Sequence, residues 1–230
     1  MELSTGRFIG AIAGIVRHRT LATMIKSSQS YLDGLAPAGV IASRKLSAAG
    51  WSANAIALRC RPGGPWQRIL PGVVLLCSTQ PTRQQWRYAA LTYAQGAVIT
   101  GLDALAAHGL QCEPTGQIQL LVPAWRRLAP QEGITVERTS RMPAPSLRHG
   151  LAFAPLVRAI VDTVRVEQNP QQLLALITAP MRAGLCTVDQ LRCELAQGNQ
   201  RGSAAARKML QNVTSLRRMS TIDRFERRCA

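Results

Sequence analysis

The residues that decide the fold of this chain are 40–76, which read VIASRKLSAAGWSANAIALRCRPGGPWQRILPGVVLL. Ser43 stands where its hydroxyl can cap a short helix, and Leu46 and Ala49 follow at positions that would face inward. The tripeptide at 50–52 then supplies a glycine that ends this helix, a tryptophan that can pack, and a serine that can cap the next helix. The pattern predicts two short helices joined by a tight turn.

The second of these helices has two different faces. Spacing of three and four residues places small or apolar side chains on its inner face: Ala53, Ile56, Ala57 and Cys60. The opposite face would carry Asn54, Leu58, Arg59 and Arg61. A helix that reads DNA needs an apolar face for its own core and a face rich in hydrogen-bond donors for the duplex. Both are present here.

A hairpin completes the motif. The sequence PGGP at 62–65 is a strong helix stop, and residues 66–76 read as two strands around a Pro71-Gly72 turn. Arg68 belongs to the first of these strands. Helix, turn, helix and hairpin in this order predict a winged helix-turn-helix.

Composition favours a polyanionic partner. Of 230 residues, 28 are Lys or Arg and 12 are Asp or Glu, so the formal net charge is +16, and 47% of residues are hydrophobic, which is typical of a globular chain. Phosphate contacts release counterions and dominate nucleic-acid affinity, so this excess of cations points to nucleic acid. A GC-rich genome, in which arginine codons are common, would give the same excess without such a partner.

Neither the cysteines nor the histidines form a metal-ligand pattern. A structural zinc site announces itself by closely spaced pairs, and no Cys-x-x-Cys pair occurs. We therefore expect no metal and no cofactor, and reduced, mostly buried thiols in a cytoplasmic protein. The scattered residues are Cys60, Cys77, Cys112, Cys186, Cys193 and Cys229, with His18, His108 and His149.

The chain divides by pattern into a leader (1–22), a winged helix-turn-helix domain (23–80) and a small α+β domain that ends in helices (82–230). The apolar run at 8–16 is too short to span a bilayer, so we expect no membrane partner. The leader reads as a disordered or loosely helical segment, or as the product of a misassigned start codon, with Met24 as the true beginning. The whole chain is predicted to be mainly helical and of the α+β class.

Further helices are predicted at 23–36, 97–110, 155–166, 170–184, 187–196 and 202–213, and strands at 118–122 and 134–138. Thr82 is expected to cap one more helix, with Trp86, Ala89, Ala90, Tyr93 and Ala94 on its inner side. His108 falls at a helix end, where a histidine meets the helix dipole favourably, so we interpret it as structural.

Several segments match a known family in order and spacing. They are GVIASR (39–44), AAGWS (48–52), WQRILPGV (66–73), residues 83–90, GAVIT (96–100), AAHGL (106–110), and residues 122–123, 156–162 and 220–228. Over residues 24–228 the chain resembles the AbiEi-like antitoxins of type IV toxin–antitoxin systems. The match is to the actinobacterial form, without the C-terminal Vsr-like nuclease domain that many long members carry.

This resemblance implies a transcriptional regulator that binds promoter DNA through a winged helix and represses its own operon. It also implies a second domain that counteracts a nucleotidyltransferase-type toxin. The positions carried over as DNA-binding are Arg44, Ser52, Asn54, Arg59, Arg61 and Arg68. Asn54 has the chemistry to read adenine, because its amide can pair both ways with that base edge. Trp51 and Trp66 are interpreted as core aromatics.

We predict that the protein is not an enzyme. After residue 190 the acidic residues are Glu194, Asp223 and Glu226, which is too few and too close to arginines for a metal-dependent nuclease centre. No nucleophile elbow and no glycine-rich phosphate loop occurs. Two other interpretations stay open: a remnant of the nuclease-bearing form, and a protein-interaction module in which DNA binding is secondary.

Overall fold

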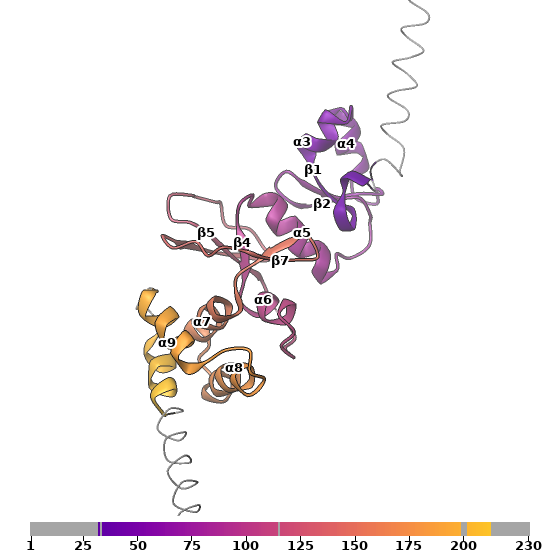
Figure 1. The fold of residues 1–230 in the computed structure, drawn as a ribbon. Helices are drawn as coiled ribbons and strands as arrows, with labels where there is room; N and C mark the ends of the chain where they lie inside the picture. Colours follow the sequence, from indigo (N-terminus) through magenta and orange to yellow (C-terminus); the bar gives the residue numbers. More distant parts are fainter. Residues whose placement is uncertain (1–31, 33, 115, 199–201, 213–230) are drawn as a thin grey trace, which may run out of the picture. The chain divides into compact units, whose positions relative to one another are not determined.

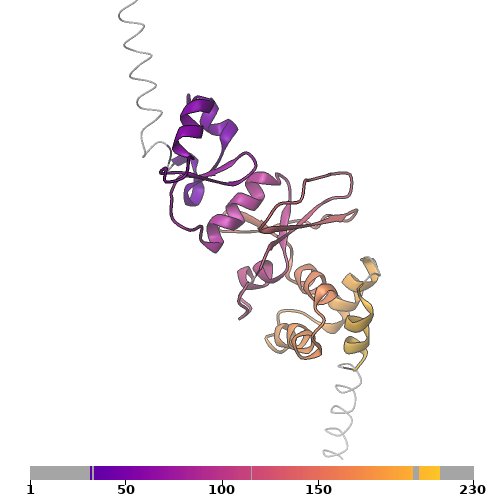
Figure 2. The same cartoon turned by 180° about the vertical axis from the view of Figure 1, so that it is seen from behind.

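The computed structural model describes Leu32 and residues 34–114, 116–198 and 202–212, and Figures 1 and 2 show it from opposite sides. The chain forms two compact units that divide after Gln95. Each unit has its own β-sheet, one of three strands and one of five. The fold is mixed α+β, as the sequence predicted. The leader at 1–22, Met24 and most of the helix predicted at 23–36 lie outside the described residues.

The first unit alternates short helices and strands. In chain order these are η1 (Pro37–Gly39), β1 (Val40–Ala42), α3 (Ser43–Ala48), α4 (Ala53–Arg59), β2 (Gln67–Leu70), β3 (Val73–Leu75) and α5 (Arg83–Tyr93). All three strands are antiparallel, in the order β1-β3-β2. The β2–β3 hairpin turns at Pro71-Gly72, where Gly72 has a φ of +72° that glycine adopts without strain.

A single apolar cluster holds this unit together. It unites residues from before η1 with residues of β1, α3, α4 and the hairpin: Leu32, Ala36, Ile41, Leu46, Ile56, Trp66 and Val74. Leu35, Trp51, Cys60 and Leu76 pack against it. The predicted inward positions Leu46 and Ala49 are both buried, and the interpretation of Trp66 as a core residue is confirmed, since only 4% of it is exposed.

Two local predictions for the helix pair are wrong. Ser43 does not cap α3: Ala42 occupies the N-cap position, and the Ser43 side chain is the first of the helix. This happens because β1 continues directly into α3, and the Ser43 N–H donates to the carbonyl of Gly72 on the hairpin, at 2.8 Å. The prediction that Ala53 and Ala57 lie on the inner face of α4 is also wrong, since both are exposed. In this short helix the contact with the core is made by Ile56.

The division between the units differs from the predicted boundary at 80–82. Thr82 begins α5 as expected, with a capping box in which its hydroxyl accepts from the Gln85 N–H and the Gln85 side chain accepts from the Thr82 N–H. However, α5 packs on η1 and on all three strands of the first sheet. Ala89, Ala90 and Ala94 are fully buried there. The helix therefore belongs to the first unit.

The second unit combines a sheet with a group of helices. Its elements are β4 (Val98–Thr100), α6 (Leu102–Ala107), β5 (Ile118–Pro123), β6 (Ile134–Thr139), β7 (Ser146–Arg148), β8 (Leu151–Phe153), α7 (Leu156–Val166), α8 (Pro170–Arg182) and α9 (Val188–Gln197), followed by a helical segment at 204–212. The strand order is β6-β5-β4-β8-β7. β4 pairs with β5 antiparallel and with β8 parallel, and β5 pairs with β6 parallel.

The single helix predicted at 97–110 is wrong. Residues 98–100 instead form β4, the central strand of the sheet, and only α6 is helical. Val98, Ile99 and Thr100 are β-branched and fully buried, which suits a strand with neighbours on both sides. Gly101, with a φ of +70°, then turns the chain into α6. The β7–β8 hairpin, which turns at His149-Gly150, was also missed by the sequence analysis.

The three helices after β8 follow the predictions closely. α7, α8 and α9 match the segments expected at 155–166, 170–184 and 187–196 to within two residues at each end. Asn169 caps α8, and Thr187 with Gln190 forms a capping box on α9. α7 contacts α6, α8, α9 and β4, so it joins the helices to the sheet.

Candidate nucleic-acid interface

The position of α4 is fixed by its two ends. Gly50, with a φ of +96°, ends the preceding helix, and the Trp51 N–H closes that end by donating to the Leu46 carbonyl at 3.0 Å. The hydroxyl of Ser52 then accepts from the Ala55 N–H at 3.1 Å and caps α4, as the sequence predicted. The turn is thus hydrogen-bonded on both sides, which sets the direction in which α4 leaves it.

The outer side of α4 is free of the core. Asn54 and Leu58 are four residues apart and lie on one face of the helix, and both are exposed, Leu58 to 60%. Ile56 is buried on the other side. The helix therefore presents an amide and an apolar side chain outward, the two groups that can contact an adenine edge and a thymine methyl in a major groove.

Arg59 lies against two tryptophan rings. Its guanidinium carbon is 4.6 Å from the centroid of the Trp51 ring and 5.0 Å from that of Trp66. The two rings are themselves 4.9 Å apart at 60°. A guanidinium over an aromatic face keeps its charge and its in-plane donors, so stacking restricts the Arg59 side chain without neutralising it.

The backbone after α4 brings the hairpin close to the helix end. The Trp66 N–H donates to the Arg59 carbonyl at 3.1 Å. Gly64 lies in this turn, and a Cβ at its position would come within 2.2 Å of the Arg59 carbonyl oxygen, so only glycine fits without movement. Arg61 is not on the helix, because α4 ends at Arg59 and Cys60 is its C-cap. Arg61 is exposed in the bend that follows.

Arg68 on β2 is near enough to Cys60, the C-cap of α4, to act on its charge. Burial raises the pKa of the Cys60 thiol, and the nearby Arg68 guanidinium acts in the opposite direction. Arg68 is itself exposed. The structure therefore brings Arg59, Arg61 and Arg68 to one region, the junction of α4 with the hairpin. Arg44, on α3, is exposed on a separate helix.

The charge of this region has one sign. Between residues 34 and 102 the chain contains seven Lys and Arg and no Asp or Glu. They are Arg44, Lys45, Arg59, Arg61, Arg68, Arg83 and Arg87. Sequence reasoning weighed only the net charge of the whole chain, although this run without carboxylates is visible in the sequence. A segment whose charges all have one sign attracts anions more strongly than the same number of cations mixed with carboxylates.

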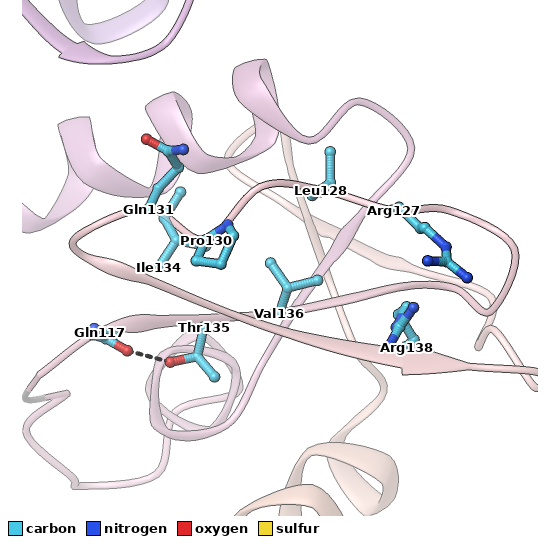
Figure 3. A pocket seen from close by; sticks show the side chains of 9 residues that line it. All are labelled: Gln117, Arg127, Leu128, Pro130, Gln131, Ile134, Thr135, Val136 and Arg138. Carbon is cyan, nitrogen blue, oxygen red and sulfur yellow. Dashed lines mark hydrogen bonds between the residues drawn. The ribbon is translucent and has the colours of Figure 1, made fainter.

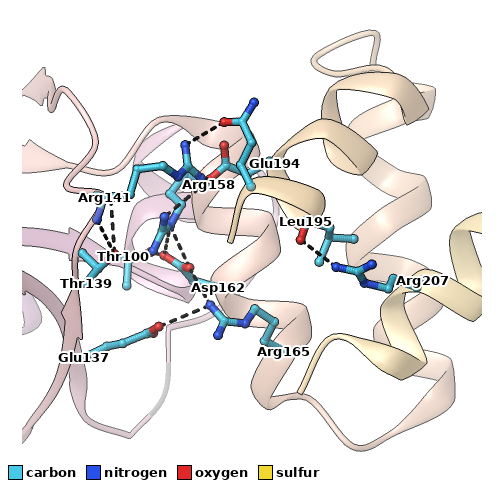
Figure 4. Close-up of polar contacts among 11 residues, drawn as sticks. Thr100, Glu137, Thr139, Arg141, Arg158, Asp162, Arg165, Glu194, Leu195 and Arg207 are labelled. Atoms are coloured by element: carbon cyan, nitrogen blue, oxygen red, sulfur yellow. Dashed lines mark hydrogen bonds and ion pairs between the residues drawn. The ribbon is translucent and has the colours of Figure 1, made fainter. Parts of the chain in front are cut away.

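The second unit contains a buried polar network, shown in Figure 4. The carboxylate of Asp162 accepts from Nε of Arg158 at 2.9 and 3.0 Å and from the Thr100 hydroxyl at 2.7 Å. Burial raises the pKa of Asp162, while the Arg158 charge and the Thr100 hydrogen bond act to lower it. This network ties α7 to the central strand β4.

Ion pairs extend the network to other elements. Glu194 on α9 pairs with Arg141 and, at 3.5 Å, with Arg158. Arg165 on α7 pairs with Glu137 on β6 at 3.3 Å. The carboxylates are thus held by arginines and connect α7, α9 and the sheet. Among the residues that the structure describes, no group of three His, Cys, Asp or Glu side chains could hold a metal ion.

His108 occupies a structural position, and the described cysteines are free thiols that differ in burial. His108 is the C-cap of α6, and its Nε2 lies 2.8 Å from the Ala154 carbonyl oxygen. Cys60, Cys77, Cys112, Cys186 and Cys193 are free thiols. The expectation that most thiols are buried is wrong for these five, since only Cys186 is buried, three are half-buried and Cys193 is exposed.

Comparison with known proteins supports the fold alone. No family model matches the chain, and a search of curated proteins finds no match either. Among solved structures, the chain is similar to the crystal structure of the RV2827C protein from Mycobacterium tuberculosis, with a TM-score of 0.53. The similarity covers 84% of this chain and 76% of that chain, at 17% sequence identity. Within the described ranges, no helix has the length and hydropathy needed to cross a bilayer.

Proposed function

We propose that residues 32–76 act as a winged helix-turn-helix that binds duplex DNA, and that the protein is a cytoplasmic transcriptional regulator of the type IV antitoxin kind. α3 and α4 would be the helix pair, with α4 in the major groove, and the β2–β3 hairpin would be the wing. The observation that carries this proposal is the run from 34 to 102 with seven cations and no carboxylate.

Each carried-over residue has a role in this proposal. Asn54 would read a base edge, since it is exposed near the start of α4, where recognition helices contact bases. Arg61 and Arg68 would contact phosphates beside the groove, and Arg59 would do so from its fixed position on the tryptophans. Arg44 would contact the backbone from α3. Ser52 caps α4 through its oxygen, so its hydroxyl proton remains available for a phosphate.

A gel-shift titration with the gene's own upstream DNA and a scrambled duplex tests this proposal. Arg61→Gln with Arg68→Gln should weaken binding to both duplexes and lower the salt slope by about 0.9 for each lost phosphate contact. The matched control is Arg148→Gln with Arg182→Gln, which removes the same charge from exposed positions of the second unit. Equal losses in the two double variants would contradict the assignment of the interface to the first unit.

Asn54→Ala tests base reading separately. It should reduce the preference for the upstream DNA over the scrambled duplex, because one good base contact contributes about 1–3 kcal/mol of discrimination. Binding to the scrambled duplex should stay unchanged. If the variant keeps the full preference, the reading helix is not α4.

Exposed apolar side chains of the second unit are candidate contacts for a protein partner, in line with the resemblance to antitoxins. Leu147 on the edge strand β7 is 72% exposed, and Leu174 and Leu185 are also exposed large apolar side chains. Counteracting a nucleotidyltransferase-type toxin would use this unit. Co-purification with the product of a neighbouring nucleotidyltransferase gene, and its loss in Leu147→Glu, would support this role. Retained co-purification in Leu147→Glu would move the contact away from β7.

A further inference from the structure

The second unit contains an open groove of about 520 Å³ that the proposed function does not use. It lies between β6 and the loop that connects β5 to β6, as Figure 3 shows. Apolar side chains line its middle: Leu128 and Pro130 from the loop, and Val136 from the strand. Ligand sites for small organic groups have volumes of about 300–1,000 Å³. The groove is therefore large enough for a nucleobase with its sugar.

The two ends of the groove differ in chemistry. Arg127 and Arg138 lie at one end (Figure 3), and both are exposed. Within residues 34–114, 116–198 and 202–212, neither forms an ion pair with a carboxylate, and no lining residue is acidic. At the other end the Thr135 hydroxyl donates to the Gln117 side chain. One end thus suits an anion, and the other suits the polar edge of a planar ring.

An exposed aromatic residue, Trp125, stands two positions before Arg127 of the cationic end. Trp125 is 82% exposed, the largest exposed fraction among the large apolar side chains of the described residues. It stands in a turn closed by the Arg126 N–H donating to the Pro123 carbonyl at 2.9 Å. Its Cα is within about 8 Å of that of Arg127, because consecutive Cα atoms are about 3.8 Å apart. A tryptophan as exposed as this has little packing role, but it can stack a base.

We propose that this groove binds single-stranded nucleic acid. One base lies on Leu128, Pro130 and Val136, with its polar edge toward Gln117. Arg127 and Arg138 hold the phosphate of that nucleotide, and the neighbouring base stacks on Trp125. An aromatic side chain beside a cationic groove is the usual arrangement of proteins that bind unpaired strands. An acidic peptide would use the two arginines, but it would not explain an exposed tryptophan beside an apolar floor.

Fluorescence anisotropy with labelled dT12 and U12 strands tests the proposal on the full chain. Arg127→Gln with Arg138→Gln should lower the salt slope by about 1.4, since each single-strand phosphate contact contributes about 0.7. Trp125→Ala should weaken binding about 5- to 150-fold, and Trp125→Phe should restore most of the affinity, because stacking needs only an aromatic face. Comparing dT12 with U12 shows whether the strand is DNA or RNA. The matched control is again Arg148→Gln with Arg182→Gln, which should bind as the unmodified chain does.

Each of the following outcomes would overturn the single-strand proposal. No binding of either strand at low salt, or equal losses in the groove and control variants, would leave no specific single-strand site. A polyglutamate chain that competes as well as dT12 would identify the groove as a site for an acidic peptide. Equal weakening of upstream duplex binding would make the groove part of a duplex interface. The proposal that the first unit binds duplex DNA fails on a different result, namely unchanged duplex binding in Arg61→Gln with Arg68→Gln.

Discussion

Individual arginines in this protein have roles that their neighbours decide. Arg59 stacks on Trp51 and Trp66 at the surface, whereas Arg158 is buried and bonds to Asp162. The sequence shows both simply as arginines close to apolar residues. A buried arginine needs a partner because an unpaired charge away from water is costly, and a carboxylate four residues later on the same helix supplies one. The spacing of Arg158 and Asp162 was therefore a usable signal that sequence reasoning missed.

Arg158→Met should destabilise the protein strongly at neutral pH. It leaves buried Asp162 with only the more distant Arg165 guanidinium, at 3.8 Å, and removing one partner of a buried pair costs about 3–5 kcal/mol. Loss of the Arg158 charge also raises the pKa of Asp162 further above its ordinary value of 3.8. A raised folded-state pKa contributes stability that is present below 3.8 and is lost as the pH rises through the raised pKa. The free energy of unfolding of the variant should therefore fall further below that of the unmodified chain as the pH rises from 3.8 to 7.

Urea unfolding at a series of pH values measures this effect. Arg158→Met with Asp162→Leu is the control, because it removes both charges, and it should lose less free energy of unfolding than the single variant at pH 7. If the difference in free energy of unfolding between Arg158→Met and the unmodified chain stays constant from pH 4 to 7, Asp162 does not titrate as described.

Short helices in this protein depend on their caps. α4 contains seven residues and buries only Ile56 on the core, so packing stabilises it little, and its ends matter more. The sequence identified this cap correctly at Ser52, where glycine, tryptophan and serine follow one another. It misplaced the cap at Ser43, because whether a serine precedes a helix or begins it depends on the strand before it, and β1 is fixed by pairing with β3.

Ser52→Ala should lower the free energy of unfolding by about 1 kcal/mol, since it removes the acceptor for the Ala55 N–H. Urea denaturation followed by circular dichroism measures the loss. Ser47→Ala on α3 is the matched control, because Ser47 is an exposed residue inside a helix, where alanine is tolerated. Equal stability of Ser52→Ala and the unmodified chain would show that the cap does not stabilise α4.

Charge is distributed unevenly over the whole molecule. Residues 34–95 carry seven cations and no carboxylate, whereas the described residues of the second unit carry eleven cations and eight carboxylates. In the second unit several of these charges pair with one another, as in Arg158–Asp162 and Arg165–Glu137. Long-range attraction of a polyanion depends on net charge, so we expect the first unit to dominate duplex binding.

Arg44→Gln with Lys45→Gln tests this expectation at the level of the whole chain. Both residues are exposed on α3, and their loss should reduce duplex affinity more at 50 mM than at 200 mM salt, because screening already weakens the contacts at the higher concentration. Filter binding at the two salt concentrations measures the change. The control variant, Arg148→Gln with Arg182→Gln, should lose little duplex affinity by comparison. A greater loss in that pair would place the duplex on the second unit.

The sequence by itself determined the elements whose signals are local. Caps at Ser52 and Thr82, the glycine at 50 and the hairpin turn at Pro71-Gly72 each depend on residues within a few positions, so they could be read directly. The same holds for β5, which is an apolar run, and for β6, where Ile134 and Val136 alternate with polar residues.

Tertiary structure decided what depends on residues far apart in the chain. Val98–Thr100 became a strand because β5 and β8 lie on either side of it, and α5 joined the first unit because its alanines pack on that sheet. The Arg59 stack on Trp51 and Trp66, the Asp162 network and the groove beneath the β5–β6 loop arise in the same way. The physical reason is that burial and charge pairing depend on distance in space, whereas spacing along the chain reports only on the nearest turns.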